Sequence, residues 1–275
     1  MAVDVSAEVI ANTRLSSDYN VLALAAPTIA AAAFPGQFVM LKSSPGLDPL
    51  LRRPFSIFEH LRDPDGAPTG ISILNKRVGI GTSQLYTARP GDRIAVLGPL
   101  GRPFVPVHPP EEAWMVAGGV GLAPFATLAE ELADRGTPMT LFYGARTAAD
   151  LYYRDLFTEM GAHLVLATED GSAGTHGRVT IALERELRAL RPDHRVTIYA
   201  CGPTPMMHAV ARLGAEYGRY VSVSLEPTMG CGMGGCYSCV VRVRIGDDTR
   251  FVRSCLDGPV FDASIVIWDA LQVGH

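Results

Sequence analysis

The pattern of apolar and polar positions changes its rhythm near residue 105. Before this point, short β-type runs alternate with turn clusters such as Asp63-Pro64-Asp65-Gly66 and Arg89-Pro90-Gly91-Asp92. The predicted strands are 21–25, 37–41, 55–59, 70–75 and 93–97, and the one helical pattern is 82–88. Short strands with turn signals and no long helix predict a small antiparallel β-barrel.

After a proline-rich linker at 105–112, strand and helix patterns alternate. The predicted strands are 113–117, 139–143, 163–167, 196–200 and 221–225, and the helices are 124–135, 149–160, 181–190 and 205–217. Alternating strands and helices indicate βαβ units with a Rossmann-like parallel sheet. Such sheets bind ligands beyond the carboxyl ends of their strands.

The remaining residues predict a hairpin, with strands 240–245 and 250–253, and a final strand 260–267. The chain therefore divides into an antiparallel barrel at 1–106, an α/β domain at 112–224 and a small C-terminal domain at 225–275. The predicted fold class is a β-barrel plus α/β. A length of 275 residues suits two or three such domains.

Composition excludes several classes of protein. Hydrophobic residues make up 48% of the chain and charged residues 19%, as in globular proteins with sizeable cores. The net charge of −4 indicates neither nucleic acid nor an anionic membrane as a partner. The acidic N-terminus does not resemble a secretory signal, and the Ala-rich run at 22–33 is too short to span a bilayer. We therefore expect a cytoplasmic protein.

Four of the five cysteines form one pattern. Cys231, Cys236 and Cys239 have the spacing C-x4-C-x2-C, and Cys255 follows after fifteen residues. This is the spacing of plant-type ligands to a 2Fe-2S cluster, and the interleaved glycines allow the tight backbone curl that such a loop needs. The alternatives are disulfides or a zinc site, but zinc sites usually pair their cysteines in two short units.

The stretch Arg53-Pro54-Phe55-Ser56 begins a predicted barrel strand. Its arginine can neutralise a diphosphate, and its aromatic ring and hydroxyl can meet a flavin ring. Further along, Gly79-Ile80-Gly81-Thr82 opens a short predicted helix, whose N-terminus favours anions. Together the two stretches favour a flavin diphosphate site, although each alone is consistent with an ordinary strand edge and a plain turn.

A second glycine stretch follows the first strand of the α/β domain. Gly119, Gly121 and Pro124 read as G-x-G-x-x-P at the start of a helix, which suits a dinucleotide pyrophosphate. The third glycine of the dinucleotide pattern is absent, so a simple βα turn is the alternative. Cys201 ends another strand of this sheet, where it either faces the ligand crevice or is a buried apolar cysteine.

Other polar residues decide less. Arg146 follows the second strand of the sheet, and Glu169 with Asp170 follows the third. These side chains can bind a ribose or a phosphate of the nucleotide, or they can be solvated or cap turns. The sequence therefore does not distinguish NADH from NADPH. The seven histidines are scattered without the spacing of a metal pair, and no grouping suggests a hydrolase.

Taken in order, these motifs resemble one family. They include Arg-Pro-Phe-Ser, Gly-x-Gly-Thr, Leu-Gly-Pro-Leu-Gly, Gly-Gly-Val-Gly-x-Ala-Pro, Tyr-Gly-Ala-Arg, Cys-Gly-Pro-x-Pro-Met-Met and the cysteine stretch with Cys-Leu-Asp-Gly-Pro-Val-Phe. Over essentially the whole chain, the sequence is similar to the electron-transfer subunits of class 1B dihydroorotate dehydrogenases, which belong to the ferredoxin–NADP reductase superfamily.

The resemblance implies three cofactor sites. FAD would contact Arg53, Pro54, Phe55, Ser56, Leu74, Asn75, Lys76, Gly81 and Thr82. NAD(H) would lie over Gly119 and Gly121, with Cys201 as a catalytic residue near the contact of nicotinamide and flavin. The 2Fe-2S cluster would pass electrons to or from an FMN-bearing catalytic subunit in a heterotetramer, as part of pyrimidine biosynthesis.

Departures from the family pattern gather around the cluster. Pro227 stands where a charged residue is expected, Tyr237-Ser238 where Leu-Gly is common, and Arg253-Ser254 where the family approaches its fourth cysteine differently. They leave two alternatives for function. One is an NAD(P)H-dependent reductase subunit of another oxidoreductase, such as a hydrogenase, a transhydrogenase or a secondary-metabolism enzyme. The other is a regulatory redox sensor without turnover.

Overall fold

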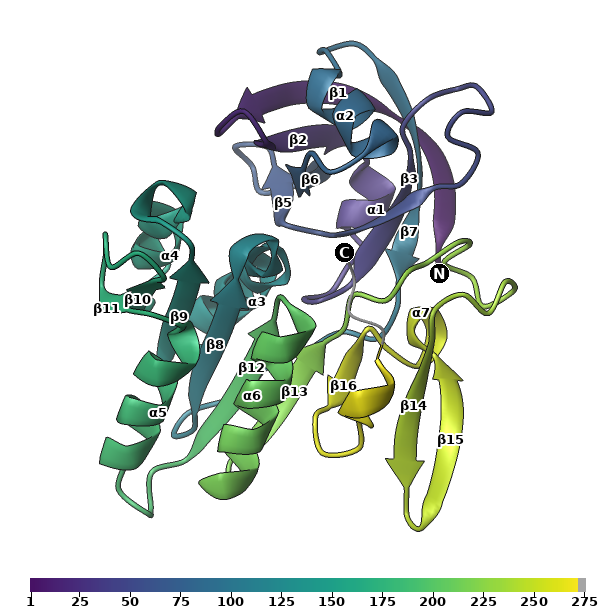
Figure 1. Cartoon of the computed structure of the whole chain (residues 1–275). Coiled ribbons are helices and arrows are strands. Elements are labelled where there is room, and N and C mark those ends of the chain that lie inside the picture. The colour runs from purple at the N-terminus through teal and green to yellow at the C-terminus, as the bar shows by residue number, and fades with distance from the viewer. Residues whose placement is uncertain (272–275) are drawn as a thin grey trace.

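The computed structural model describes residues 1–271 and confirms the predicted fold class. An antiparallel sheet curls into a half-barrel, a mostly parallel sheet carries helices, and a small C-terminal part lies against both (Figure 1). None of the helices in the described residues is long and apolar enough to cross a membrane.

The curled sheet contains seven strands in the order β4-β3-β7-β1-β2-β6-β5, all paired antiparallel. Their bounds are β1 Val3–Arg14, β2 Tyr19–Ala25, β3 Phe38–Lys42, β4 Arg53–Ser56, β5 Glu59–Arg62, β6 Pro68–Lys76 and β7 Arg93–Leu100, with short helix α1 at Pro27–Ala30 and α2 at Ile80–Thr87. Apolar side chains from most of these strands fill one core beneath α1 and α2. The long strand β1 was not among the predicted strands.

The predicted strand at 55–59 is wrong, because the chain changes neighbours there. Strand β4 ends at Ser56 beside β3, and β5 begins at Glu59 beside β6. Between them, Ile57 and Phe58 are both buried, so the two-residue alternation of a strand is interrupted. A run of apolar residues reads as one strand in sequence, although here it joins the two edges of the sheet.

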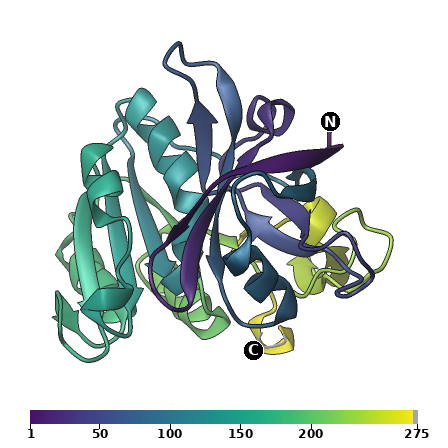
Figure 2. The same ribbon diagram turned by 90° about the horizontal axis from the view of Figure 1, so that it is seen from above.

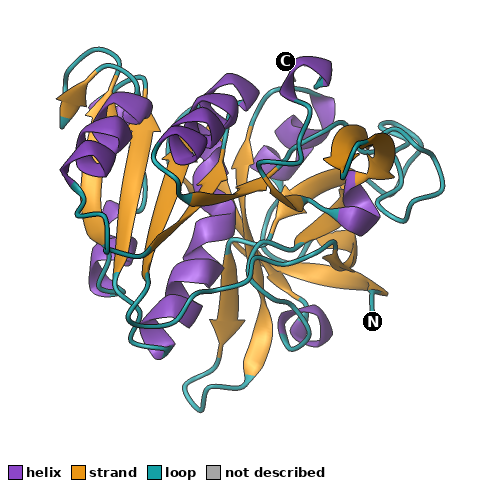
Figure 3. Ribbon diagram, turned by 90° about the horizontal axis from the view of Figure 1, so that it is seen from below, coloured by secondary structure: helices purple, strands orange, loops and turns teal. Residues whose placement is uncertain are grey.

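The second sheet has the order β11-β10-β9-β8-β12-β13-β16, parallel except for its last strand. Its strands are β8 Glu112–Gly118, β9 Met139–Ala145, β10 His163–Thr168, β11 Thr175–His176, β12 Val196–Cys201, β13 Tyr220–Ser224 and β16 Val260–Asp262. Helices α3 (Ala123–Asp134) and α4 (Arg154–Glu159) pack on one face, and α5 (Val179–Ala189) and α6 (Thr204–Glu216) on the other (Figure 3). The five predicted strands of this sheet are all present.

One predicted helix of this part is wrong. In place of a helix at 149–160, the chain forms the 3-10 turn Ala148–Asp150 and then the short α4. Tyr153 separates them with a φ of 58°, in the left-handed region, and its ring meets Phe58 edge-on at 4.8 Å. Packing against the curled sheet therefore breaks a helix that the local sequence pattern favours.

The C-terminal part begins with the cysteine-rich loop and continues into the hairpin of β14 (Val240–Ile245) and β15 (Asp248–Arg253). Helix α7 (Ser254–Asp257) and β16 follow, and a 3-10 turn occupies Trp268–Ala270. The predicted hairpin is confirmed. The final strand is shorter than the predicted 260–267, because Asp262 ends it by accepting a hydrogen bond from the backbone N–H of Ser264 (2.8 Å).

Aromatic contacts join the two sheets, which lie side by side when seen from above (Figure 2). Phe104, just after the curled sheet, stacks on Phe125 of α3 at 5.8 Å and meets Tyr199 of β12 edge-on at 5.4 Å. Val21, Phe58 and Leu74 of the curled sheet belong to the same buried cluster as α3. The two sheets therefore share a core, and a ligand between them contacts both.

Candidate functional site

The predicted flavin residues come together at one end of the curled sheet. Arg53–Ser56 is strand β4, and the start of α2 lies beside it, because a Cβ on Gly81 would be 3.5 Å from Cγ of Arg53. Among the described residues, Arg53 has no carboxylate partner, and its guanidinium donates only to the carbonyls of Leu51 and Arg52. Arg52, by contrast, pairs with Asp4 at 2.8 Å. An unneutralised arginine beside a helix N-terminus fits a diphosphate.

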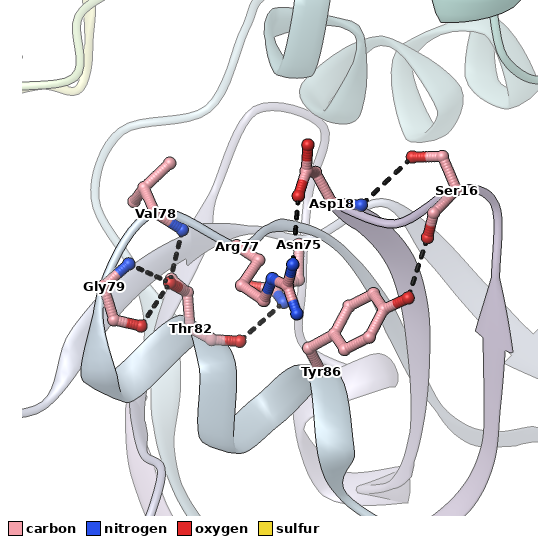
Figure 4. Close-up of polar contacts among 8 residues, drawn as sticks. All are labelled: Ser16, Asp18, Asn75, Arg77, Val78, Gly79, Thr82 and Tyr86. Carbon is pink, nitrogen blue, oxygen red and sulfur yellow. Dashed lines mark hydrogen bonds and ion pairs between the residues drawn. The ribbon is translucent and has the colours of Figure 1, made fainter.

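Thr82 is not the first residue of this helix, and its side chain caps the helix N-terminus, as Figure 4 shows. Helix α2 begins at Ile80, and the Thr82 hydroxyl oxygen accepts the N–H groups of Val78 and Gly79, both at 2.9 Å. The hydroxyl in turn donates to the carbonyl of Gly79 at 3.0 Å. The hydroxyl of Thr82 therefore makes its hydrogen bonds within the helix cap, and a ligand at this position would contact the backbone N–H groups at the start of the helix.

Leu74, Asn75 and Lys76, at the end of β6, have three different environments. Leu74 is buried in the core shared by the sheets. Asn75 is fully buried and donates to Asn20 at 2.7 Å. It also donates to the carbonyl of Thr82 at 3.0 Å and so supports α2 (Figure 4). Lys76 lines a cavity between the sheets. Of the three side chains, Lys76 is the one on a cavity wall.

That cavity has a volume of about 640 Å³ and lies at the carboxyl ends of the parallel strands. Tyr19 and Lys76 line it from the curled sheet, Gly118 lines it from the end of β8, and Gly119, Gly202 and Glu226 line it from the segments after β8, β12 and β13. The start of α5, the end of β9 and Glu169 just after β10 complete its wall. A cavity on this edge of the sheet, walled by glycine backbone and a helix start, fits a dinucleotide.

The two glycines of the predicted dinucleotide motif differ. Gly119 lines the cavity in a left-handed conformation, with φ of 55°. Gly121 is buried behind the wall, where a Cβ would lie 2.2 Å from the carbonyl oxygen of Cys201. Gly121 therefore lets the glycine turn pack against the end of β12, and Gly119 faces the ligand space.

Cys201 is the last residue of β12 and is fully buried. Burial raises the pKa of its thiol well above the usual range, and Oε1 of Glu226 lies 3.8 Å from its sulfur. The cavity wall begins with the next residues, Gly202 and Pro203. The thiol therefore stays protonated directly behind the wall, and its catalytic role remains a prediction.

The structure separates the roles of two neighbouring acids after β10. Asp170 accepts hydrogen bonds from the N–H and hydroxyl of Ser172 (3.0 and 2.6 Å), which lower its pKa and use its carboxylate within the turn. Glu169 lines the cavity together with Arg146 and Arg178. Sequence reasoning missed Tyr19, Arg178 and Glu226, and only the position of Glu226 directly after the last parallel strand offered a signal.

The four predicted cluster cysteines meet as two pairs on one loop and α7. Ser238 and Cys231 lower the pKa of the Cys236 thiol, and burial together with Cys239 raises that of Cys255, so each of these thiols has a second cysteine beside it. Among the described residues, no group of three or more such side chains surrounds a single point that would suit one metal ion. Two pairs of thiols fit a cluster of two irons, each with two cysteine ligands, better than one zinc ion.

The cysteine loop curls tightly and rests on the curled sheet. Gly232 and Gly234 have φ of 73° and 80°, and a Cβ on Gly232 would lie 2.5 Å from Cγ of Met40 on β3. The inner pair, Cys239 and Cys255, is buried with Phe38, Met40, Leu97 and Leu100. The outer pair, Cys231 and Cys236, is more exposed. Met233 and Tyr237 beside it are 62% and 63% exposed.

The chemistry of the inner pair also suits a cluster. Ser254 precedes Cys255 and is fully buried, yet its hydroxyl has no hydrogen-bond partner among the described residues. Burial and the neighbouring Cys239 raise the pKa of the Cys255 thiol to about 12, and a bound metal would deprotonate a coordinating thiol. The residues present therefore fit the cluster.

Comparison with known proteins identifies two parts of the chain. Residues 115–212 match the oxidoreductase NAD-binding domain, and residues 226–267 match the iron–sulfur cluster binding domain of dihydroorotate dehydrogenase B. The chain is 40% identical over 247 residues to the electron transfer subunit of dihydroorotate dehydrogenase B (NAD(+)) from Desulforamulus reducens, covering 89% of this chain and 90% of that one. The corresponding subunit of Geobacillus kaustophilus is 42% identical, covering 85% of this chain and 86% of the relative.

Among solved structures, the chain resembles a chain of the NADH-dependent reduced ferredoxin–NADP oxidoreductase. The TM-score is 0.83 at 32% identity, and the match covers 97% of this chain and 91% of the other. The ferredoxin reductase of carbazole 1,9a-dioxygenase, at 24% identity and a TM-score of 0.66 over 79% of this chain and 67% of that one, shares the fold.

Proposed function

Because this chain belongs to the family of dihydroorotate dehydrogenase B electron transfer subunits, we propose that it carries electrons between NAD(H) and a partner flavin enzyme that oxidises dihydroorotate. When bound, NAD(H), FAD and the 2Fe-2S cluster supply the hydride and single-electron chemistry, and the protein supplies position and electrostatics. The observation that carries the proposal is the order of the three sites along one path.

The path follows neighbouring strands. The dinucleotide cavity reaches Tyr19 on β2 and Lys76 on β6 of the curled sheet, and Arg53 to Ser56 form β4, an edge strand that contacts β6 where the sheet curls. Strand β4 pairs with β3 so that Pro54 lies opposite Met40, and Met40 contacts the cysteine loop. A flavin on β4 would therefore have the dinucleotide on one side and the cluster on the other.

We propose NADH as the preferred nucleotide, with Glu169 accepting from the hydroxyls of the adenosine ribose. The carboxylate of Asp170 already accepts a hydrogen bond within its turn, so Glu169 is the acid that can face the ligand. A carboxylate accepts hydrogen bonds from a ribose 2′-hydroxyl and repels the 2′-phosphate of NADPH. Arg146 and Arg178 flank it and offer positive charge for the pyrophosphate.

The partner docks at the outer pair of cysteines in this proposal. Met233 and Tyr237 expose apolar surface beside Cys236, and Leu256 of α7 adds to it. We expect two copies of this chain to assemble with two FMN-bearing catalytic subunits, and the chain alone not to oxidise dihydroorotate. The runner-up is a reductase subunit of another oxidoreductase, which the likeness to the ferredoxin–NADP oxidoreductase chain favours.

Two further expectations accompany the function. We propose a cytoplasmic location, because four cysteines kept for a cluster need a reducing compartment. We also propose domain limits of 1–106 for FAD, 112–224 for the nucleotide and 225–275 for the cluster, of which residues 272–275 lie outside the described part.

The first test adds NADH to the purified, cofactor-loaded protein without oxygen. Bleaching of the flavin absorbance is expected with NADH and should be slower with NADPH. Failure of both nucleotides to reduce the flavin would reject the enzyme and leave the redox-sensor alternative. Co-purification of a dihydroorotate-oxidising subunit, with NAD-linked activity of the complex, would separate the proposed partner from the runner-up.

The second test removes one predicted cluster ligand. Cys236→Ser should abolish the visible absorption and the reduced-state EPR signal of the cluster while FAD stays bound, because β4 and α2 lie outside the cysteine loop. Cys201→Ser is the matched control and should keep the cluster. An unchanged cluster in Cys236→Ser would refute the ligand set.

A further inference from the structure

Two serines lie against the cysteine pairs, and both stand where the sequence departs from its family pattern. Ser238 lies on the cysteine loop beside the outer pair, with Oγ 3.1 Å from Sγ of Cys236. The same oxygen accepts the backbone N–H of Gly230 at 2.8 Å. Either atom can donate while Cys236 is a thiol, but a cysteine that ligates a metal has lost its hydrogen, so toward such a thiolate the Ser238 hydroxyl is the donor.

Ser254 adjoins the inner pair through its backbone, and among the described residues its hydroxyl makes no hydrogen bond to either cysteine sulfur. It precedes Cys255 in α7, and its backbone N–H donates to the carbonyl of Cys239 at 2.9 Å. Its side chain is fully buried, and within residues 1–271 its hydroxyl has no hydrogen-bond partner. A buried hydroxyl without a partner is unfavourable, so a partner outside the protein chain is expected.

We propose that Ser238 and Ser254 donate hydrogen bonds to the sulfur atoms of the cluster unit, that is, to its thiolates or sulfides, and thereby raise its reduction potential. The inference rests on the proposed function, because it needs a cluster on the four cysteines. Reduction adds one negative charge to the cluster, so a donor to sulfur stabilises the reduced form more than the oxidised form.

The two serines contribute unequally. Ser238 is exposed, and water can replace part of its hydrogen bond. Ser254 is buried with the inner pair, where the low dielectric strengthens a hydrogen bond and no solvent substitutes for it. The cluster of this chain is therefore easier to reduce than that of a relative without the two hydroxyls, which favours its role as an acceptor of electrons from the partner's FMN.

The test is a redox titration of the loaded protein followed by EPR. Ser254→Ala should lower the midpoint potential of the cluster, and Ser238→Ala should lower it by less. Ser238→Thr keeps a hydroxyl and should have the potential of the wild type. Ser264→Ala, an exposed serine of the same C-terminal part, is the control and should leave the potential unchanged.

A second measurement separates this role from a structural one. In cluster-free protein, Ser254→Ala should unfold at the same temperature as the wild type or higher, because the lost hydroxyl has no partner there. Unchanged potentials in both alanine variants would overturn the inference, and so would a marked loss of stability in cluster-free Ser254→Ala. A wild-type protein without any cluster signal would instead reject the proposed function.

Discussion

Five residues of one type show how far environment decides chemistry in this chain. Cys236 is exposed, and hydrogen bonds from Ser238 lower the pKa of its thiol to about 6. Cys201 is fully buried beside Glu226, and burial raises the pKa of its thiol well above the usual range. The first favours a thiolate near neutral pH, and the second stays a thiol.

This contrast predicts the order of alkylation in cluster-free protein. Iodoacetamide should modify Cys236 first, with a rate that reaches half its maximum near about pH 6, because the thiolate is the reactive form. Cys201 should resist until the protein unfolds. Peptide mapping by mass spectrometry measures both, with denatured protein as the control in which all five react.

Loading the cluster should protect Cys236 from the reagent, since a ligated sulfur is not free to attack. Equal reaction of Cys201 and Cys236 in the native chain would contradict the assigned environments.

At the level of single elements, helix α2 links a local cap to a cofactor site. Its start carries the free N–H groups that suit a diphosphate beside Arg53, and Thr82 holds the preceding turn in place. Asn75 supports the same turn from β6. The anion site therefore depends on a hydroxyl that does not itself face the ligand.

Replacing Thr82 by Val removes the hydroxyl and keeps the size of the side chain. We expect a loss of about 1 kcal/mol in the free energy of unfolding, the usual effect of losing a helix cap, and weaker retention of FAD on dilution. Thermal unfolding and the flavin content after gel filtration measure the two effects.

The control is Thr87→Val at the exposed end of the same helix, where the hydroxyl donates within the last turn. If Thr87→Val lost as much flavin as Thr82→Val, the cap would not be the cause.

At the scale of the whole molecule, the position of the two sheets relative to each other decides whether the cofactors can meet. Besides the aromatic core, an ion-pair group joins them: Nδ1 of His60 lies 3.5 Å and Nε of Arg62 3.6 Å from the carboxylate of Glu130 on α3. The hydrogen bond from His60 and the charge of Arg62 lower the pKa of Glu130 below its usual 4.5.

This group predicts a pH-dependent contribution to stability. A lowered pKa in the folded state means that Glu130 stabilises fully above about pH 4.5 and that the effect is lost as pH falls through the folded pKa. Glu130→Gln should therefore lower the free energy of unfolding near neutral pH by at most about 1 kcal/mol, because the pair is partly exposed, and the melting temperature should fall with it.

The difference from wild type should shrink in acid, where the carboxylate is protonated in both states. Glu159→Gln, an exposed acid on α4, serves as the control and should change little at any pH. If the difference in melting temperature between Glu130→Gln and wild type stayed constant from neutral to acid pH, lost packing and not charge would be responsible.

The sequence by itself determined the features that depend on local chemistry. The spacing of Cys231, Cys236, Cys239 and Cys255 identified one site because ligands close along the chain must be close in space. The alternation of strands and helices likewise predicted the parallel sheet, since the apolar face of a sheet must be buried against the apolar faces of helices. Arg53 and Gly81 were paired on the expectation of a shared anion, and they do lie side by side.

Only the tertiary structure decided what depends on distant neighbours. Tyr153 breaks a predicted helix because Phe58 of the other sheet packs on it. Glu169, not Asp170, faces the cavity because Ser172 takes the second carboxylate. Nothing in the sequence distinguishes Ser254 from a surface serine; its burial beside Cys239 and Cys255 leaves its hydroxyl without a partner among residues 1–271. Burial is a property of the whole chain, and no local pattern carries it.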